Sequence, residues 1–318
     1  MRLRLFVFSL IMVTALPTAQ QLSAQGQIPR LAGHTFVTSN LIRDPFVKTQ
    51  LGLLIGLGSA FDYEIRGPVL GEDTLIVEEG KMTWVIAEFD YRQRVTDWLQ
   101  LDALVGGGAR VGTNAASAIA QGVSVVSAFR LGGLARLAQS NSVALSATLS
   151  VNRSSSTLLN LVEFAEEIID SVESGGSLDS LSLSRKVNTW QGRGGVRFAW
   201  APSRALGVTA LAALSVGEDL LVLEETATSW NAGALLDLDL HSISNVPLGF
   251  VIGYHYGSQA HRSEQASGGS HRATVGIAYM GRDDFSVGLE LLGESVPLPN
   301  EAQNVTAVIM SLRLRYYF

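Results

Sequence analysis

The last eight residues of the chain, Ser-Leu-Arg-Leu-Arg-Tyr-Tyr-Phe at 311–318, decide the fold class. Two sets of side chains alternate strictly through this stretch up to the final residue. The apolar set is Leu312, Leu314, Tyr316 and Phe318, and the other set is Ser311, Arg313, Arg315 and Tyr317. Since successive side chains of a β-strand point to opposite faces, a period of two predicts a strand with one apolar face.

The same alternation recurs in about twelve segments along the chain. They span approximately residues 49–63, 82–95, 99–109, 123–137, 143–152, 190–200, 206–217, 230–241, 248–258, 272–280, 285–293 and 304–318. In this register Leu101 and Leu289 are expected on the apolar face at mid-membrane, and Gln100 on the polar face. Each segment thus presents one apolar face and one polar face to different surroundings.

The connections between these segments fall into two length classes that alternate along the chain. Those expected to face outward are residues 64–81, 110–122, 153–189, 218–229, 259–271 and 294–303. All are longer than the five turns between them. Short turns on one side of a membrane and long loops on the other are typical of barrels that span a membrane by strands.

The aromatic terminal strand, the even strand number and the two loop classes together resemble Gram-negative outer-membrane β-barrel proteins. This resemblance implies an all-β, transmembrane, antiparallel up-and-down barrel of about twelve strands. It also implies contact with outer-membrane lipid and lipopolysaccharide, and an assembly signal read by the barrel-insertion machinery at Leu314, Tyr316 and Phe318. A soluble β-sandwich also alternates and is the structural alternative.

The N-terminus predicts export from the cytoplasm. Arg2 and Arg4 precede an apolar run over residues 5–16, and small residues follow near 22–24, as in a secretory signal peptide. We therefore expect a signal peptide at 1–24, a separate segment at 25–48 and the barrel at 49–318. The middle segment is similar in position to the lumen plug of long-chain fatty-acid channels, so it is expected to be a plug or a periplasmic tail.

Composition limits the classes of function. Hydrophobic residues make up 47% of the chain and charged residues 16%, and cysteine is absent. Removal of residues 1–24 leaves 21 basic and 29 acidic residues, a net charge of −8, which argues against a nucleic-acid partner. We expect no cofactor and no metal site.

Charged residues of both signs occupy the inward parity of the expected strands. They are Glu88, Asp90, Arg92, Arg94, Asp102, Arg130, Arg136, Arg193, Arg197, Asp237, Asp239, His255, Arg272, Glu290, Arg313 and Arg315. Such a set either lines an aqueous pathway or closes a narrow lumen with ion pairs. A twelve-stranded barrel is narrower than general porins of 16 to 18 strands, so an open pathway would be small.

Two further patterns predict features outside the lumen. Aromatic residues near the strand ends are candidates for interfacial girdles: Trp84, Trp98, Trp190, Trp200, Trp230, Tyr254, Tyr256, Tyr279 and Tyr316. Apolar residues at helical spacing between Leu158 and Val172 predict a short helix near 157–173 in an outer loop, capped by residues 154–157.

Three functions follow from this sequence, of which passive passage of a small solute is the leading interpretation. A non-conducting surface protein that binds a partner or maintains the envelope is the second. A lipid-modifying hydrolase is the third, because outer-membrane phospholipases are similar in strand number. Their motif is matched only by the spacing of His261 and Ser263, with Glu264 where the family has Asn, so we expect no enzyme.

Overall fold

The computed structural model describes residues 28–66, 69–70, 73–74, 77–112, 123–159, 184–218, 226–258, 269–297 and 304–318. The expected signal peptide and the motif at 261–263 lie outside the described residues. Within the described residues, no helix has the length and apolarity needed to cross a membrane.

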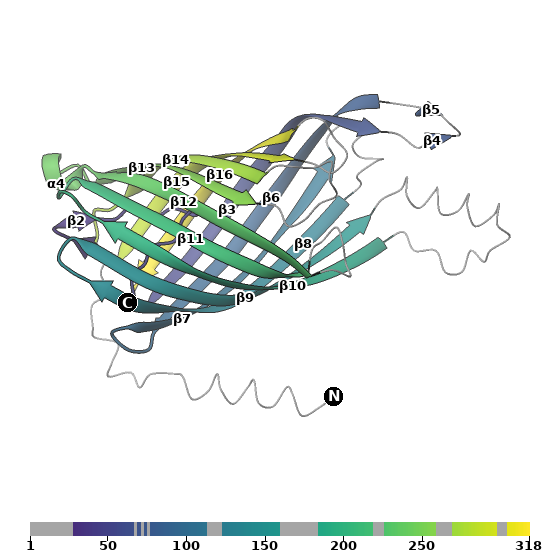
Figure 1. The fold of residues 1–318 in the computed structure, drawn as a ribbon. Coiled ribbons are helices and arrows are strands. Elements are labelled where there is room, and N and C mark those ends of the chain that lie inside the picture. The colour runs from purple at the N-terminus through teal and green to yellow at the C-terminus, as the bar shows by residue number, and fades with distance from the viewer. Residues whose placement is uncertain are drawn as a thin grey trace.

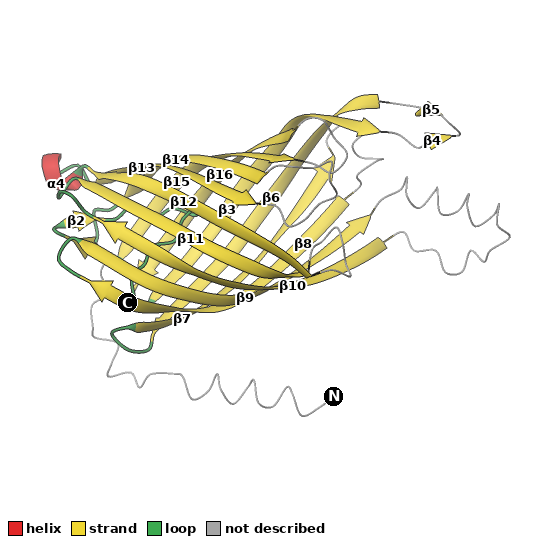
Figure 2. Cartoon of the chain, in the orientation of Figure 1, coloured by secondary structure: helices red, strands yellow, loops and turns green. Residues whose placement is uncertain are grey.

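Twelve antiparallel strands form a closed barrel (Figures 1 and 2). They are β3 (Gln50–Arg66), β6 (Val77–Arg94), β7 (Leu99–Gly112), β8 (Val123–Gln139), β9 (Val143–Leu159), β10 (Ser184–Trp200), β11 (Leu206–Glu218), β12 (Thr226–Asp239), β13 (Leu248–Ser258), β14 (Gly269–Tyr279), β15 (Phe285–Pro297) and β16 (Asn304–Tyr317). Each strand pairs with its neighbour in the sequence, and β16 pairs with β3. The predicted fold class and strand number are confirmed.

Closure between β16 and β3 leaves no free sheet edge. Arg313 lies opposite Leu54 and Tyr317 opposite Gln50, with continuous pairing from Thr306 to Tyr317. A strand in hydrocarbon has no water to satisfy its peptide groups, so the sheet must close on itself. The C-terminal stretch therefore completes the hydrogen-bonded wall.

The outer face of the barrel is apolar, as the alternation predicts. The side chains of Leu101 and Leu289 are 53% and 47% exposed, whereas neighbouring Gln100 is 1% exposed. Tyr316 and Phe318 share this outer face, where their rings stack edge to face with centroids 4.9 Å apart. The predicted inward and outward parities are confirmed at these positions.

Two tryptophans on β10 mark the height of the apolar band. Trp190 and Trp200 both point outward and are separated by ten residues along one strand. At about 3.3 Å per residue and a tilt of about 40°, they lie roughly 25 Å apart along the membrane normal. Leu101 also points outward and is three residues from Trp98, another outward tryptophan, and its depth in the membrane stays a prediction.

Trp84 does not belong to the outer girdle. Its side chain packs against the buried pair Ala60 and Ala307 on the inner side of the wall. The even residues of β6 point inward, and Gly58 on the paired strand gives the indole its space. The girdle prediction was therefore wrong for this tryptophan.

The strands extend further toward the long loops than predicted. β9 continues to Leu159 and pairs with β10 back to Ser184, so residues 154–157 are strand and do not cap a helix. The rest of the predicted helix, 160–173, lies outside the described residues. Helix α4 (His241–Ser244) is a single turn where the end of a strand was expected. Hairpin β4 (Val69–Leu70) and β5 (Asp73–Thr74) extends from the loop between β3 and β6 (Figure 1).

Candidate functional site

Residues 28–49 lie inside the lumen at the end of the barrel that carries the short turns, here called the turn end. They contain the two-residue strands β1 (Arg30–Leu31) and β2 (His34–Thr35), which pair only with each other. Figure 1 shows β2 at the same end as α4 and the C-terminus. We call residues 28–49 the lumen segment.

Apolar side chains anchor the lumen segment against the inner wall in two clusters. The first consists of Ile28, Val37 and Ile42 with Leu235, Val251, Ala278, Met280 and Tyr317. The second consists of Leu31, Phe36 and Phe46 with Ala144, Ala199 and Ala201. The rings of Phe36 and Phe46 lie 5.2 Å apart. Burial of these side chains favours the docked position of the segment.

Glycines on the inner wall let the lumen segment approach the sheet closely. A Cβ atom at Gly207 would lie 2.3 Å from His34 Nε2, and one at Gly249 would lie 2.4 Å from Val37 Cγ2. Both distances are shorter than any van der Waals contact. A larger residue at either position would therefore force the neighbouring side chains, the segment or the strand to shift.

A buried histidine and carboxylate join the segment to β12. His34 Nε2 lies 2.5 Å from Asp237 Oδ1, and His34 Nδ1 lies 3.1 Å from the carbonyl oxygen of Arg204. Both ring nitrogens thus face oxygen atoms. Either both nitrogens carry a proton, or Nδ1 carries one and the Asp237 carboxyl group carries the other. Asp239 accepts a hydrogen bond from the backbone N–H of Thr35 at 3.2 Å.

Glu290 is the second anchor and accepts hydrogen bonds from both the segment and the wall. The donors are the Ser39 hydroxyl at 2.5 Å, the Asn40 backbone N–H at 3.0 Å, the Thr274 hydroxyl at 2.8 Å and Arg313 Nη1 at 3.0 Å. Arg313 and Arg315 also donate to backbone carbonyl oxygens of Thr38 and Ser39. The carboxylate therefore holds the middle of the segment.

A third anchor follows at Arg43, Asp44 and Lys48. Arg43 lies 3.2 Å from Asp90 and 3.6 Å from Asp102. Asp44 lies 2.7 Å from Lys48 and 3.5 Å from Arg92. Burial alone would raise the pKa of Asp44, but the neighbouring Lys48 and Arg92 charges outweigh it and hold that pKa well below its usual value.

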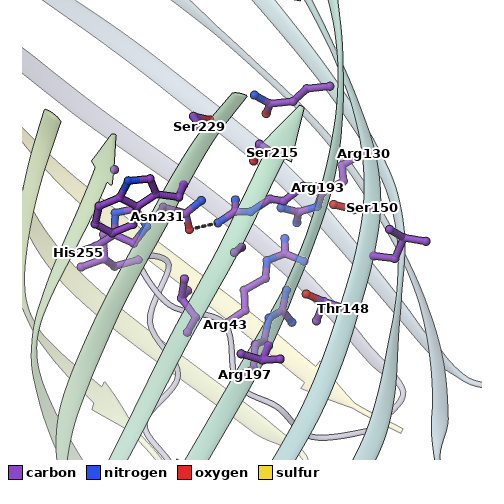
Figure 3. A pocket seen from close by; sticks show the side chains of 18 of the residues that line it. Arg43, Arg130, Thr148, Ser150, Arg193, Arg197, Ser215, Ser229, Asn231 and His255 are labelled. Atoms are coloured by element: carbon purple, nitrogen blue, oxygen red, sulfur yellow. Dashed lines mark hydrogen bonds between the residues drawn. The ribbon is translucent and has the colours of Figure 1, made fainter. Parts of the chain in front are cut away.

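Two adjoining cavities lie between the lumen segment and the long loops. Their volumes are about 420 and 380 Å³. Both are lined by Asn40, Arg43, Arg130, Gln191 and Arg193. Figure 3 shows the side chains of the larger cavity converging from several strands and from the segment. Among the described residues, the lumen segment therefore occupies the turn end of the barrel, and the two cavities lie beyond it.

Most of the sequence-predicted lumen residues meet either the segment or these cavities. Those bonded to the segment are Asp90, Arg92, Asp102, Arg197, Asp237, Asp239, Glu290, Arg313 and Arg315. Those lining the cavities are Glu88, Asp90, Asp102, Arg130, Arg193, Arg197, His255, Arg272, Arg313 and Arg315.

Arg94 and Arg136 lie apart from this set. Both have the inward parity, but they stand at the turn end of their strands and bond to Asp97 and Gln139. The parity of a residue gives its face but not its depth, so sequence reasoning could not separate them from the lumen-lining residues.

Sequence reasoning missed the polar anchors of the segment itself, above all His34, Ser39 and Arg43. A signal for them was present in β12. Asp237 faces inward, yet its register neighbours are Gly207 and Val251, so no cation on an adjacent strand is directly opposite it. A buried carboxylate without a partner in the wall requires one from elsewhere in the chain.

Comparison with known proteins identifies the fold. No protein-family model matches the chain, and no curated protein matches it. An outer-membrane channel from Pseudomonas putida F1 is similar in structure, with a TM-score of 0.57 and 14% identity over 89% of this chain and 100% of that chain.

Two other solved structures are similar. The translocator domain of the autotransporter NalP from Neisseria meningitidis has a TM-score of 0.51 and 11% identity over 85% of this chain and 88% of that chain. A Pseudomonas aeruginosa FadL homologue has a TM-score of 0.50 and 10% identity over 92% of this chain and 100% of that chain. The chain thus has the fold of bacterial outer-membrane β-barrels. None of the three is named as an enzyme.

Proposed function

We propose that the protein is a passive outer-membrane channel for small solutes and that the lumen segment gates it. The observation that carries this proposal is the hollow interior beyond a segment that is not part of the wall. Solute would enter from the long loops, occupy the two cavities and leave at the turn end when the segment moves. The solved channel with the most similar fold reported above supports the same class of function.

The segment can move without opening the wall. Its strands make no ladder with the barrel, whereas β16 and β3 close the barrel by themselves. Side-chain bonds and two apolar clusters hold it, together with backbone hydrogen bonds to the short turns from Ile28 to Asp283 and from Ala32 to Asn141, each at 2.7 Å. Its release would expose the polar inner face to water and leave the wall's backbone hydrogen bonds intact.

We further propose that residues 1–24 direct secretion, after which the barrel inserts among outer-membrane lipid and lipopolysaccharide. Leu314, Tyr316 and Phe318 lie on the outer face of the closing strand, where an insertion machinery could bind them before closure. Deletion of Phe318 is expected to lower the amount of folded protein in the outer membrane without reducing secretion. An unchanged amount of heat-modifiable protein would contradict this role.

Swelling of proteoliposomes in neutral sugars of increasing size tests the channel. We expect a variant that lacks residues 25–46 to swell faster than the full mature chain and to admit larger sugars. Heat modifiability of both proteins shows that each barrel is folded. If neither protein swells faster than protein-free liposomes, the channel proposal fails, and the non-conducting surface protein replaces it.

A further inference from the structure

The larger cavity is lined by an excess of arginines. Arg130 from β8, Arg193 and Arg197 from β10 and Arg43 from the lumen segment point into the same space (Figure 3). Asp102 is the carboxylate in that lining, and it lies 3.6 Å from Arg43 and 3.7 Å from Arg130. A fifth arginine, Arg272 of β14, also lines the cavity and is paired with Glu294 at 2.6 Å, so five guanidinium groups face a lining that supplies one carboxylate.

Two of these arginines have no carboxylate within ion-pair distance among the described residues. Arg193 donates to the side-chain oxygen of Asn231. Arg197 donates to the backbone carbonyl oxygen of Asp44 at 3.4 Å. In addition, Arg130 Nη2 is buried and has no hydrogen-bond partner in the described part of the chain. Donors therefore remain for a bound group.

The smaller cavity is also lined by more arginines than carboxylates. Arg313 and Arg315 line it with Arg43, Arg130 and Arg193. Arg315 is 5% exposed, and its Nη1 atom is buried without a partner within the described residues. Glu88 and Asp90 are the carboxylates of this lining, and Asp90 already lies 3.0 Å from Arg92 and 3.2 Å from Arg43.

Converging cations repel one another more strongly in a confined lumen than in bulk water. An anion placed among them removes that repulsion and gains charge-assisted hydrogen bonds. The planar guanidinium fork matches two oxygens of one carboxylate or phosphate group. The hydroxyl groups of Thr148, Ser150 and Ser215 line the same cavity and can bond further polar groups of a solute.

We propose that this arginine cluster is a binding site for small solutes that carry a carboxylate or phosphate group, which makes the channel selective for anions. The cavity volumes lie within the range of small-molecule sites, about 300–1,000 Å³. The selectivity rests on the channel proposed above, but binding at the cluster does not require that the barrel conduct.

The first arm of the test measures binding, with citrate and inorganic phosphate titrated into the refolded mature protein in detergent at low salt. The variant is Arg193→Gln with Arg197→Gln, and the control is Arg282→Gln, an exposed turn arginine paired with Asp284. Loss of two charge-assisted donors predicts at least about a tenfold weaker affinity for the double variant. Whichever probe binds more tightly identifies the preferred oxyanion.

The second arm measures the reversal potential of the same three proteins in planar bilayers under a potassium chloride gradient. We expect chloride to permeate better than potassium in the wild type, and the ratio to fall roughly threefold or more in the double variant. Neither change is expected for Arg282→Gln.

The outcomes separate the two proposals. Binding that the double variant loses, in a protein that never conducts, supports the anion site and rejects the channel. Conduction with equal or greater cation permeability, and no binding of either probe, rejects the anion site and leaves the channel intact. Equal binding by the wild type and the folded double variant also overturns the assignment to these arginines.

Discussion

Glu290 shows how one inward side chain can hold the lumen segment. It accepts bonds from Ser39 and Asn40 of the segment and pairs with Arg313 of the wall at 3.0 Å, and the side chains of this ion pair are only 3% and 5% exposed. Removal of one partner of a buried ion pair costs about 3–5 kcal/mol, because the other charge stays buried. Glu290 is thus a residue of the barrel wall that also holds the lumen segment in place.

We predict that Glu290→Gln loosens the lumen segment. Arg313 would lose its charged partner, and the segment would lose a carboxylate acceptor, so channel opening should become more frequent in planar bilayers. The control is Asp284→Asn in a short turn, because its partner Arg282 is 62% exposed and such surface pairs contribute little to stability. Equal opening frequencies for the two variants would contradict the role of Glu290 in holding the segment.

At this scale the sequence predicted the face of each strand residue but not its partner. The sequence placed Asp237, Glu290 and Arg313 on the inward face, because a period of two leaves only two faces. Their partners lie about 200 residues or more away in the segment, as for His34 and Asp237. A local sequence pattern contains no information about contacts between residues so far apart in the chain.

At the scale of the element, the lumen segment depends on small residues in the strands beneath it. Gly249 in β13 lies under Val37, and a Cβ atom there would be 2.4 Å from the valine. We predict that Gly249→Val displaces the segment, since overpacking typically costs about 1–3 kcal/mol. Trypsin should then cleave after Arg43 in the folded, detergent-solubilised variant.

The control for this prediction is Gly192→Val in β10. The nearest atom to a Cβ at Gly192 is the carbonyl oxygen of Val216 at 3.7 Å, an ordinary contact. This variant should leave the segment as protected as in the wild type. Full protection of Arg43 in Gly249→Val would show that the close approach does not hold the segment.

A second element-scale prediction concerns the depth of the outer face. Val196 lies about midway between Trp190 and Trp200 on β10 and is 45% exposed. Arginine at mid-membrane costs about 2–4 kcal/mol and near the interface about 0–1 kcal/mol. Refolding titrations in lipid should therefore show a large loss for Val196→Arg and a small loss for Leu214→Arg, which lies opposite Trp230.

Strand number was predictable from the sequence, whereas strand length was not. The alternation fades in the serine-rich stretch 153–157, so the sequence suggested a loop and a helix cap there. In the structure β9 and β10 pair through this stretch, Arg153 with Trp190 and Thr157 with Lys186. Backbone pairing with a neighbouring strand overrides the weak local preference of serine for turns and caps.

At the scale of the whole molecule, the barrel closes without the lumen segment. The wall is closed by β16 and β3, and the segment closes the lumen only at the turn end. The cavities of about 420 and 380 Å³ lie on the other side of it. The proposed function therefore requires that the lumen can conduct and that residues 28–49 determine whether it is open.

Gating by the lumen segment can be measured as the planar-bilayer conductance of the mature protein and of a folded variant lacking residues 25–46. We expect a small conductance with many substates for the intact protein, because the segment detaches only partly. For the deletion variant we expect a larger and steadier conductance. A deletion variant that is folded, inserted and as tightly sealed as a protein-free bilayer would contradict it.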